Sequence, residues 1–222
     1  MKKPVIVLSL GDPAGIGPEV ALKAISDPQI RRSADFVLAG LPSSLPKGKK
    51  VAGVGWLRPS SIPSWPRSRP SAASGRVAAD SLRLAARLVM TGSAEALVTA
   101  PLSKEALHQA GEDFAGHTEM LADLAGLKAD QVGMMLVGGG LRVFLATRHL
   151  GLKRALSSLE PLALKKSIRL CAGGLNSLFS IPKPRLALAA LNPHAGEGGA
   201  FGDEEGRILR PVVRFFHKER KF

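Results

Sequence analysis

The stretch Val5-Ile6-Val7-Leu8-Ser9, with Gly11-Asp12-Pro13-Ala14-Gly15-Ile16-Gly17-Pro18-Glu19 close behind it, predicts a strand, a glycine-rich turn and a helix in succession. The apolar run has the length of a buried strand. Pro18 suits the first position of a helix, which we expect to continue to about Ser26. A strand–turn–helix unit of this kind is the building block of α/β folds.

Alternating patterns continue along the rest of the chain. We expect further strands at residues 36–39, 96–99, 132–137, 141–147 and 185–191, and helices at residues 74–90, 103–111, 153–171 and 203–221. Ser74 and Ser103 can cap their helices, and Gly138-Gly139-Gly140 predicts a hairpin between two of the strands. Residues 41–70 form a proline-rich, basic connector without periodicity. This order predicts an α/β layered fold with a largely parallel or mixed sheet.

Composition and charge exclude several classes of protein. Of the 222 residues, 45% are hydrophobic and 22% are charged, which is typical of a soluble globular chain. Cys171 is the single cysteine, so an internal disulfide framework and a cysteine-rich zinc module are excluded. The net charge of +13 comes almost entirely from residues 41–70 and 207–222, so we do not expect a nucleic-acid-binding face. We expect a cytoplasmic protein that does not span a membrane.

Two candidate sites follow the expected strands at residues 5–9 and 96–99. The glycines between Gly11 and Gly17 allow tight turns and the close approach of a ligand, so this loop either binds an anion or is a structural turn. The loop does not match the dinucleotide fingerprint G-x-G-x-x-G. In Thr99-Ala100-Pro101-Leu102-Ser103-Lys104, Lys104 either contacts an anionic substrate or lies exposed in the first turn of a helix.

Histidines mark the other candidate sites. Gly116-His117-Thr118-Glu119 opens a helix at which backbone amides, a hydroxyl and an imidazole could bind a phosphate together. His149 and His194 each follow an expected strand, so the pair either binds Zn²⁺ or a similar ion with a third ligand or is a coincidence. We expect His108 and His217 to face solvent. The sequence contains neither a G-x-S-x-G elbow nor a P-loop, which disfavours a serine hydrolase and P-loop phosphoryl transfer.

Five segments occur in an order that resembles the 4-hydroxythreonine-4-phosphate dehydrogenases of pyridoxal 5′-phosphate biosynthesis. They are Gly11-Asp12-Pro13-Ala14-Gly15-Ile16-Gly17-Pro18-Glu19, Thr99-Ala100-Pro101 with Lys104-Glu105-Ala106-Leu107, Gly116-His117-Thr118-Glu119, Thr147 with His149-Leu150, and Asn192-Pro193-His194-Ala195-Gly196-Glu197-Gly198-Gly199. The resemblance covers nearly all of the chain except residues 41–70.

The resemblance implies an isocitrate/isopropylmalate-dehydrogenase-like α/β/α fold and a homodimer with active sites at the subunit interface. It implies NAD- or NADP-dependent oxidation of 4-phosphohydroxy-L-threonine, followed by decarboxylation to 3-amino-2-oxopropyl phosphate. A divalent metal, Zn²⁺, Mg²⁺ or Co²⁺, would polarise the reacting oxygen. By motif, His117 and Thr118 would bind the substrate, Lys104 would be a further anion contact, and His149 and His194 would be metal ligands.

The chain departs from the family pattern at its C-terminal side. In the family, a third metal-ligand histidine lies in a later Tyr-His-Asp-Gln segment, which this sequence lacks. We therefore interpret residues 1–222 as a partial dehydrogenase fold, truncated before the portion that completes the metal and nucleotide sites. Two alternatives stay open. One is a non-catalytic remnant that binds a phosphorylated ligand, and the other is a paralogue acting on another phosphorylated hydroxy acid, such as phosphoerythronate.

Overall fold

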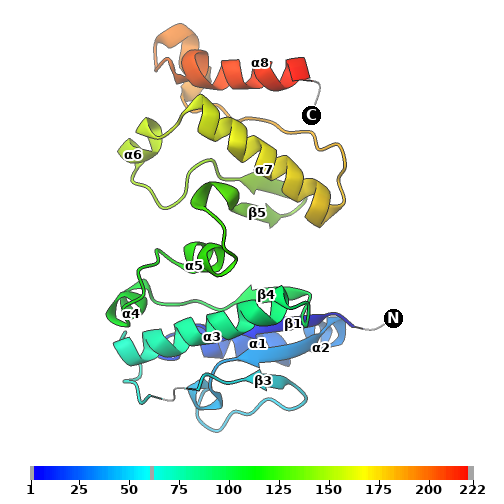
Figure 1. Cartoon of the computed structure of the whole chain (residues 1–222), viewed down its shortest axis with the longest axis vertical. Coiled ribbons are helices and arrows are strands. Elements are labelled where there is room, and N and C mark those ends of the chain that lie inside the picture. Colours follow the sequence, from blue (N-terminus) through cyan, green and yellow to red (C-terminus); the bar gives the residue numbers. More distant parts are fainter. Residues whose placement is uncertain (1–2, 61–62, 220–222) are drawn as a thin grey trace. The chain divides into compact units, whose positions relative to one another are not determined.

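The computed structural model of the chain describes residues 3–60 and 63–219. The chain separates into two compact units, Met1–Gly126 and Leu127–Phe222, which are coloured from blue to green and from green to red in Figure 1. We describe each unit by itself.

Unit 1 contains a four-stranded parallel sheet. Its strands are β1 (Val5–Ser9), β2 (Asp35–Ala39), β3 (Gly55–Leu57) and β4 (Ala96–Thr99), in the order β3-β2-β1-β4. The expected strands at residues 5–9, 36–39 and 96–99 are confirmed. The proline-rich connector at residues 41–70 contains two short elements that its lack of periodicity did not predict, β3 and the short helix η1 (Pro42–Ser44). Three residues between prolines and glycines are too few to show a strand period.

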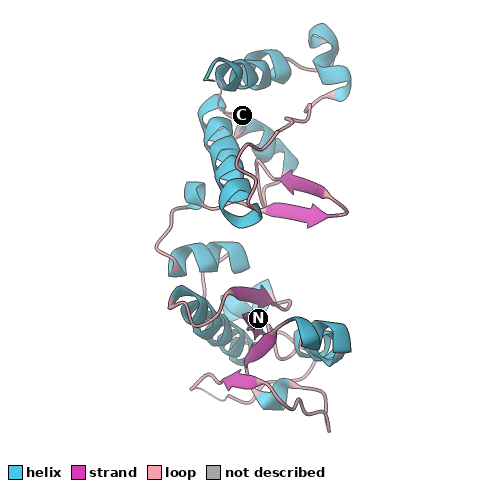
Figure 2. Ribbon diagram, turned by 90° about the vertical axis from the view of Figure 1, so that its right-hand side faces the viewer, coloured by secondary structure: helices cyan, strands magenta, loops and turns pink. Residues whose placement is uncertain are grey.

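The sheet is covered on both faces because the side chains of β1 alternate between them. Leu8 packs with Ala21 and Ile25 of α1 (Gly17–Ser26), whereas Val7 packs with Ala85 of α3 (Ala72–Met90) on the other face. Figure 2 shows these strands between helices on either side. A short helix, α2 (Pro28–Ser33), connects α1 to β2. The sheet and its two helical layers form the expected α/β arrangement.

The helix α3 begins earlier than expected. Ser71, rather than Ser74, is the N-cap, and the two serines bond reciprocally in a capping box. Two turns of α3 also pack closely on α4 (Lys104–Gln109): a Cβ on Gly75 would collide with the backbone carbonyl of Ala106. Only glycine permits this approach, which holds α4 and the following helix α5 (His117–Leu124) in place.

Unit 2 is built from one hairpin and several helices. Its elements are η2 (Ala129–Gln131), β5 (Met135–Gly138), β6 (Leu141–Phe144), α6 (Leu152–Ser157), α7 (Pro161–Phe179), η3 (Pro193–Gly199), the π-helical turn η4 (Glu205–Leu209) and α8 (Arg210–Glu219). The hairpin is confirmed but forms a sheet of its own in the described residues. The helix expected at residues 153–171 is two helices, because Pro161 starts a new one. Leu164 of α7 packs with Leu209, Val212 and Phe216 in the main core of the unit.

The strand expected at residues 185–191 is wrong. No turn or bend interrupts residues 184–190, but they pair with no other described strand. Leu186 and Leu188 are 36% and 37% exposed instead of buried. An apolar run folds as a buried strand only where a second strand satisfies its backbone, and no described strand pairs with this run.

No helix in the described parts of the chain combines the length and the apolar character that a bilayer span requires.

Two glycine substitutions should have opposite effects on stability. We expect Gly75→Ala to destabilise unit 1 by several kcal/mol, because the new methyl group overlaps the α4 backbone. Gly173→Ala, in a helix position with open space around it, should instead stabilise α7 by about 0.5–1 kcal/mol. Urea unfolding followed by tryptophan fluorescence reports on unit 1, which contains both Trp56 and Trp65, and hydrogen exchange of the α7 amides reports on α7. A neutral Gly75→Ala variant would contradict the packing described for α3.

Candidate active site

The loops after β1 and β4 lie together at the carboxyl edge of the parallel sheet, where ligands collect in open α/β sheets. The Asp12 amide donates a hydrogen bond to the Pro101 carbonyl over 3.0 Å. Gly11 has φ +69°, and a Cβ there would collide with the carbonyl oxygens of Ala100 and Pro101. These contacts join the two loops into one surface.

The glycine-rich loop is held by its own polar groups. The Asp12 side chain is 4% exposed and accepts a hydrogen bond from the Ala14 amide over 2.8 Å. A Cβ on Gly17 would collide with the Leu10 carbonyl. The geometry thus gives this loop a structural role, whereas a role in anion binding stays a prediction.

The first backbone amides of α5 have no hydrogen-bond acceptor from the side chain of the capping residue. Gly116 is the N-cap and provides no side chain to the first amides of the helix. His117 and Thr118 are the first two helical residues and are partly exposed. Free amides at a helix N-terminus favour an anionic ligand.

Lys104 and Glu119 flank this helix start. A Cβ on Gly116 would lie 3.9 Å from Lys104 Cε and 3.8 Å from Glu119 Oε2. Ser103 caps α4 by accepting a hydrogen bond from the Ala106 amide, so Lys104 is the first residue of that helix and is exposed. The structure therefore places Lys104 beside the start of α5, where His117 and Thr118 lie. The ammonium group suits a phosphate or carboxylate.

Sequence reasoning missed the contribution of Glu119. Its Oε2 is buried and accepts no hydrogen bond from any described residue. A glutamate in the first turn of a helix is normally explained by the helix dipole, so its position alone gave no signal of a ligand contact. A carboxylate here can accept a hydrogen bond from a hydroxyl or ammonium group of a ligand.

His117 is neutral at physiological pH. Burial lowers the pKa of its imidazole below the usual 6.5, and a hydrogen bond with the backbone of Ala100 offsets only part of that shift. The imidazole can therefore take part in hydrogen bonding to a ligand without adding positive charge. It also ties α5 to the end of β4.

An ion pair supports the segment that leads into α5. Arg83 of α3 binds Glu112 with both guanidinium nitrogens, over 2.9 and 2.6 Å, and Glu112 is 6% exposed. The hydrogen bond to Glu112 raises the pKa of Arg83 above its usual value. Bidentate pairs of this kind fix geometry as well as charge.

In unit 2, the loop that contains His194 has a strained backbone. His194, Ala195 and Glu197 adopt φ values of 51°, 54° and 38°, in the left-handed region that non-glycine residues rarely occupy. Each such residue costs roughly 1–2 kcal/mol. His149 shares this conformation, with φ 52°, and both histidines are exposed.

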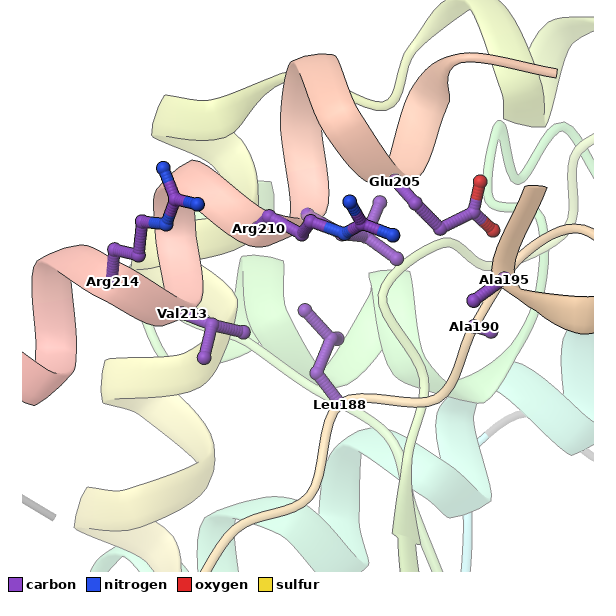
Figure 3. A pocket seen from close by; sticks show the side chains of 8 residues that line it. Leu188, Ala190, Ala195, Glu205, Arg210, Val213 and Arg214 are labelled. Atoms are coloured by element: carbon purple, nitrogen blue, oxygen red, sulfur yellow. The ribbon is translucent and has the colours of Figure 1, made fainter. Parts of the chain in front are cut away.

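A buried carboxylate fixes the start of this loop. Glu205 is 4% exposed and accepts hydrogen bonds from the Leu191 and Asn192 amides, over 2.9 and 2.6 Å, and from Asn192 Nδ2 over 2.9 Å. These hydrogen bonds lower the pKa of Glu205 to about 2. Sequence reasoning missed Glu205, because it lies 13 residues beyond Asn192, whose amide it binds. Its side chain also borders the pocket in Figure 3.

The prediction that His149 and His194 each directly follow a strand is wrong. His149 lies five residues beyond the end of β6, and His194 follows an unpaired segment. No three histidine, cysteine, aspartate or glutamate side chains in the described residues are grouped to hold a metal ion. His108 and His217 are exposed on α4 and α8, as expected. Metal binding by His149 and His194 therefore stays a prediction.

Comparisons with known proteins identify a family. The model of the pyridoxal phosphate biosynthetic protein PdxA matches residues 19–221. A 4-hydroxythreonine-4-phosphate dehydrogenase from Geobacter metallireducens is 38% identical, over 98% of this chain and 70% of the relative.

Solved structures agree with this assignment. A 4-hydroxythreonine-4-phosphate dehydrogenase from Klebsiella pneumoniae matches with a TM-score of 0.82 and 30% identity, over 98% of this chain and 73% of that protein. A terephthalate 1,2-cis-dihydrodiol dehydrogenase from Burkholderia xenovorans matches with a TM-score of 0.61 and 30% identity, over 98% and 71% of the two chains.

The shifted pKa of His117 should make unit 1 sensitive to acid. Because the folded state favours the neutral imidazole, its contribution is complete above pH 6.5 and is lost as the pH falls through the lowered folded pKa. We expect the free energy of unfolding to decrease from pH 7.5 to pH 5, and His117→Gln to remove part of this slope. Urea unfolding followed by tryptophan fluorescence measures it, with His108→Gln as the exposed control. Identical slopes for the three proteins would contradict the burial of His117.

Glu205 should protect the Asn192 amide from hydrogen exchange down to strongly acid pH. Its ionised form stabilises the fold above the usual pKa of 4.5, and this contribution is lost as the pH falls towards about 2. The protection factor of the Asn192 amide, which compares its exchange rate with the intrinsic rate at the same pH, should therefore fall over that range. Glu205→Gln should abolish the protection at neutral pH, whereas Asp203→Asn, at an exposed neighbouring carboxylate, should not.

Proposed function

This chain belongs to the PdxA family of pyridoxal phosphate biosynthetic proteins, and from that premise we propose that it is an oxidoreductase for a phosphorylated hydroxy amino acid. The proposed reaction is the oxidation of 4-phosphohydroxy-L-threonine by NAD or NADP, followed by decarboxylation to 3-amino-2-oxopropyl phosphate. The observation that carries the proposal is the convergence of Lys104 and the uncapped start of α5 at the carboxyl edge of the sheet.

Each part of this site suits one part of the substrate. Lys104 and the α5 amides bind the phosphate, and Thr118 adds a hydroxyl. The neutral His117 imidazole hydrogen-bonds a substrate oxygen, and the unpartnered Glu119 Oε2 is placed to accept from the ammonium group. Bound NAD or NADP would supply the hydride acceptor for the secondary alcohol.

The described residues do not complete a metal site. Protein zinc sites use three or four protein ligands, and no such group exists in residues 3–60 and 63–219. We therefore derive no step through a metal. His149 and His194 remain the residues that we propose as ligands for Zn²⁺, Mg²⁺ or Co²⁺, in a cytoplasmic homodimer.

Two alternatives make different predictions. A non-catalytic remnant would bind the phosphorylated ligand and transfer no hydride. A paralogue would oxidise a phosphorylated hydroxy acid without an amino group, such as phosphoerythronate. The similarity to a dihydrodiol dehydrogenase supports the second alternative, because that protein has a similar fold and is named for a different substrate.

The enzyme proposal is tested by absorbance at 340 nm. We expect NADH or NADPH to form when the protein is mixed with 4-phosphohydroxy-L-threonine, the oxidised nucleotide and Zn²⁺, Mg²⁺ or Co²⁺. Lys104→Ala should raise KM by roughly 10- to 100-fold, which corresponds to the loss of a charged hydrogen bond. Lys23→Ala, at an exposed lysine paired with Glu19, is the control and should change nothing. A flat trace from folded protein that still binds the substrate would favour the remnant.

The metal ligands are tested by titration with Zn²⁺. We expect His149→Ala and His194→Ala to weaken zinc affinity markedly, and His217→Ala to leave it unchanged. Equal loss in all three variants would contradict the assignment. Light scattering after size-exclusion chromatography measures whether the chain is a dimer.

A further inference from the structure

Glu112 is a buried carboxylate of unit 1 that the proposed chemistry does not use. It lies between α4, which carries Lys104, and α5, which carries His117 and Thr118. Its side chain is 6% exposed and accepts hydrogen bonds from both terminal guanidinium nitrogens of Arg83. A carboxylate is rarely buried to this extent unless it is paired, so the pair with Arg83 anchors the segment between the two helices to α3.

A second arginine of α3 binds the same segment. Arg76 Nη2 donates a hydrogen bond to the Ala110 carbonyl over 2.7 Å, and Arg76 Nη1 lies 3.7 Å from Glu112 Oε1. Arg76 and Arg83 are about two helical turns apart, so they lie on the same face of α3. Ala110 is the C-cap of α4, where the last carbonyls have no partner within the helix. The two arginines therefore attach the end of α4 and the residues beyond it to one face of α3.

Apolar contacts also hold α5 against these helices. Met120 of α5 is 1% exposed and packs with Leu82 of α3 and Leu107 of α4. Burial of apolar surface is non-directional, so it favours contact between the helices without fixing how far one is shifted along another. Hydrogen bonds from a guanidinium group to a carboxylate do fix that geometry. We therefore expect the arginine contacts, rather than the apolar core, to set the position of the α5 start.

The position of Glu112 matters because the candidate site is assembled from the helices on either side of it. Only residues 113–116 separate Glu112 from His117, the first residue of α5. On the other side, the Glu112 amide donates a hydrogen bond to the carbonyl of Leu107 in α4, the helix that begins with Lys104. A displacement of Glu112 thus changes the spacing between the Lys104 ammonium group and the first amides of α5.

We propose that Glu112, Arg76 and Arg83 are positioning residues of the substrate site. They act through α4 and α5 rather than by contact with the substrate, and they hold Lys104 and the first α5 amides at the spacing that binds one phosphate. Displacements of about 1 Å in a binding site lower rates by as much as about 100-fold, so the loss of these contacts is measurable. The proposal rests on the proposed function for the identity of the substrate, whereas the binding of phosphate tests it without catalysis.

The first test measures the binding of inorganic phosphate to the full chain labelled with ¹⁵N. The amide signals of His117 and Thr118 should shift in a saturable manner in the wild-type protein. Arg83→Lys, which keeps the charge and loses the bidentate geometry, should weaken phosphate binding roughly tenfold, the effect of one impaired charged hydrogen bond. Glu112→Gln, which keeps the shape and loses the charge, should have a similar effect. Asp80→Asn, at the other carboxylate that pairs with Arg83, is the matched control and should bind phosphate as the wild type does.

The second test separates positioning from stability. In the phosphate-free proteins, Arg83→Lys and Glu112→Gln should shift the amide signal of His117 and leave the signals of β1 in place, with unchanged circular dichroism. The double variant should bind phosphate no more weakly than the weaker single variant, because both changes break one pair. With the full substrate, KM should rise in the same proportion as the phosphate Kd, whereas kcat should stay within about twofold.

Arg76→Gln keeps the proposal testable if the other variants do not fold. It removes the contact of a half-exposed arginine and should weaken phosphate binding about threefold.

Four results would overturn the proposal. They are wild-type phosphate affinity in every folded variant, additive losses in the double variant, an equal loss in Asp80→Asn, and no binding of phosphate by the wild-type chain. The enzyme proposal fails in a different way, by a flat trace at 340 nm from a chain whose phosphate affinity still depends on Glu112.

Discussion

The parallel pairing of β1 with β4 is the constraint on which the candidate site depends. The register Ser9↔Thr99 ends both strands at the same level, so the loops that follow are forced into contact. The hydrogen bond from Asp12 to Pro101 and the glycine at position 11 accommodate that contact. Lys104 and His117 then follow from α4 and α5, whose positions are set by Gly75 and by the Arg83–Glu112 pair. The site thus depends on the contact between the loops that follow β1 and β4 at the carboxyl edge of the sheet.

Unit 2 depends on a different kind of support. Its core is small, and the Asn192 loop is held mainly by hydrogen bonds to the Glu205 carboxylate. Several left-handed residues, His194 among them, add strain that these hydrogen bonds must offset. The apolar residues 185–191 add little burial, because no described strand lies beside them.

Local patterns predicted those features that depend on neighbours in sequence. The strands at residues 5–9 and 96–99, the start of α1 next to Pro18 and the cap at Ser103 are all set within a few residues. The assignment of Lys104, His117 and Thr118 to a substrate site came from the family resemblance alone. Local patterns could not predict Glu119 or Glu205 as polar anchors, since their environment comes from distant or differently folded segments. The pairing of β3 was missed for the same reason, because a three-residue strand is defined by its partner.

The sequence by itself determined the α/β class, the family and the candidate residues, because apolar periodicity and ordered motifs are properties of the chain alone. Only the tertiary structure decided which apolar runs became strands: residues 5–9 have partner strands on both sides, and residues 185–190 have no partner among the described strands. It also decided the charge state of His117, since desolvation is imposed by the surrounding fold. Backbone groups must find partners in space, and no local pattern states where those partners lie.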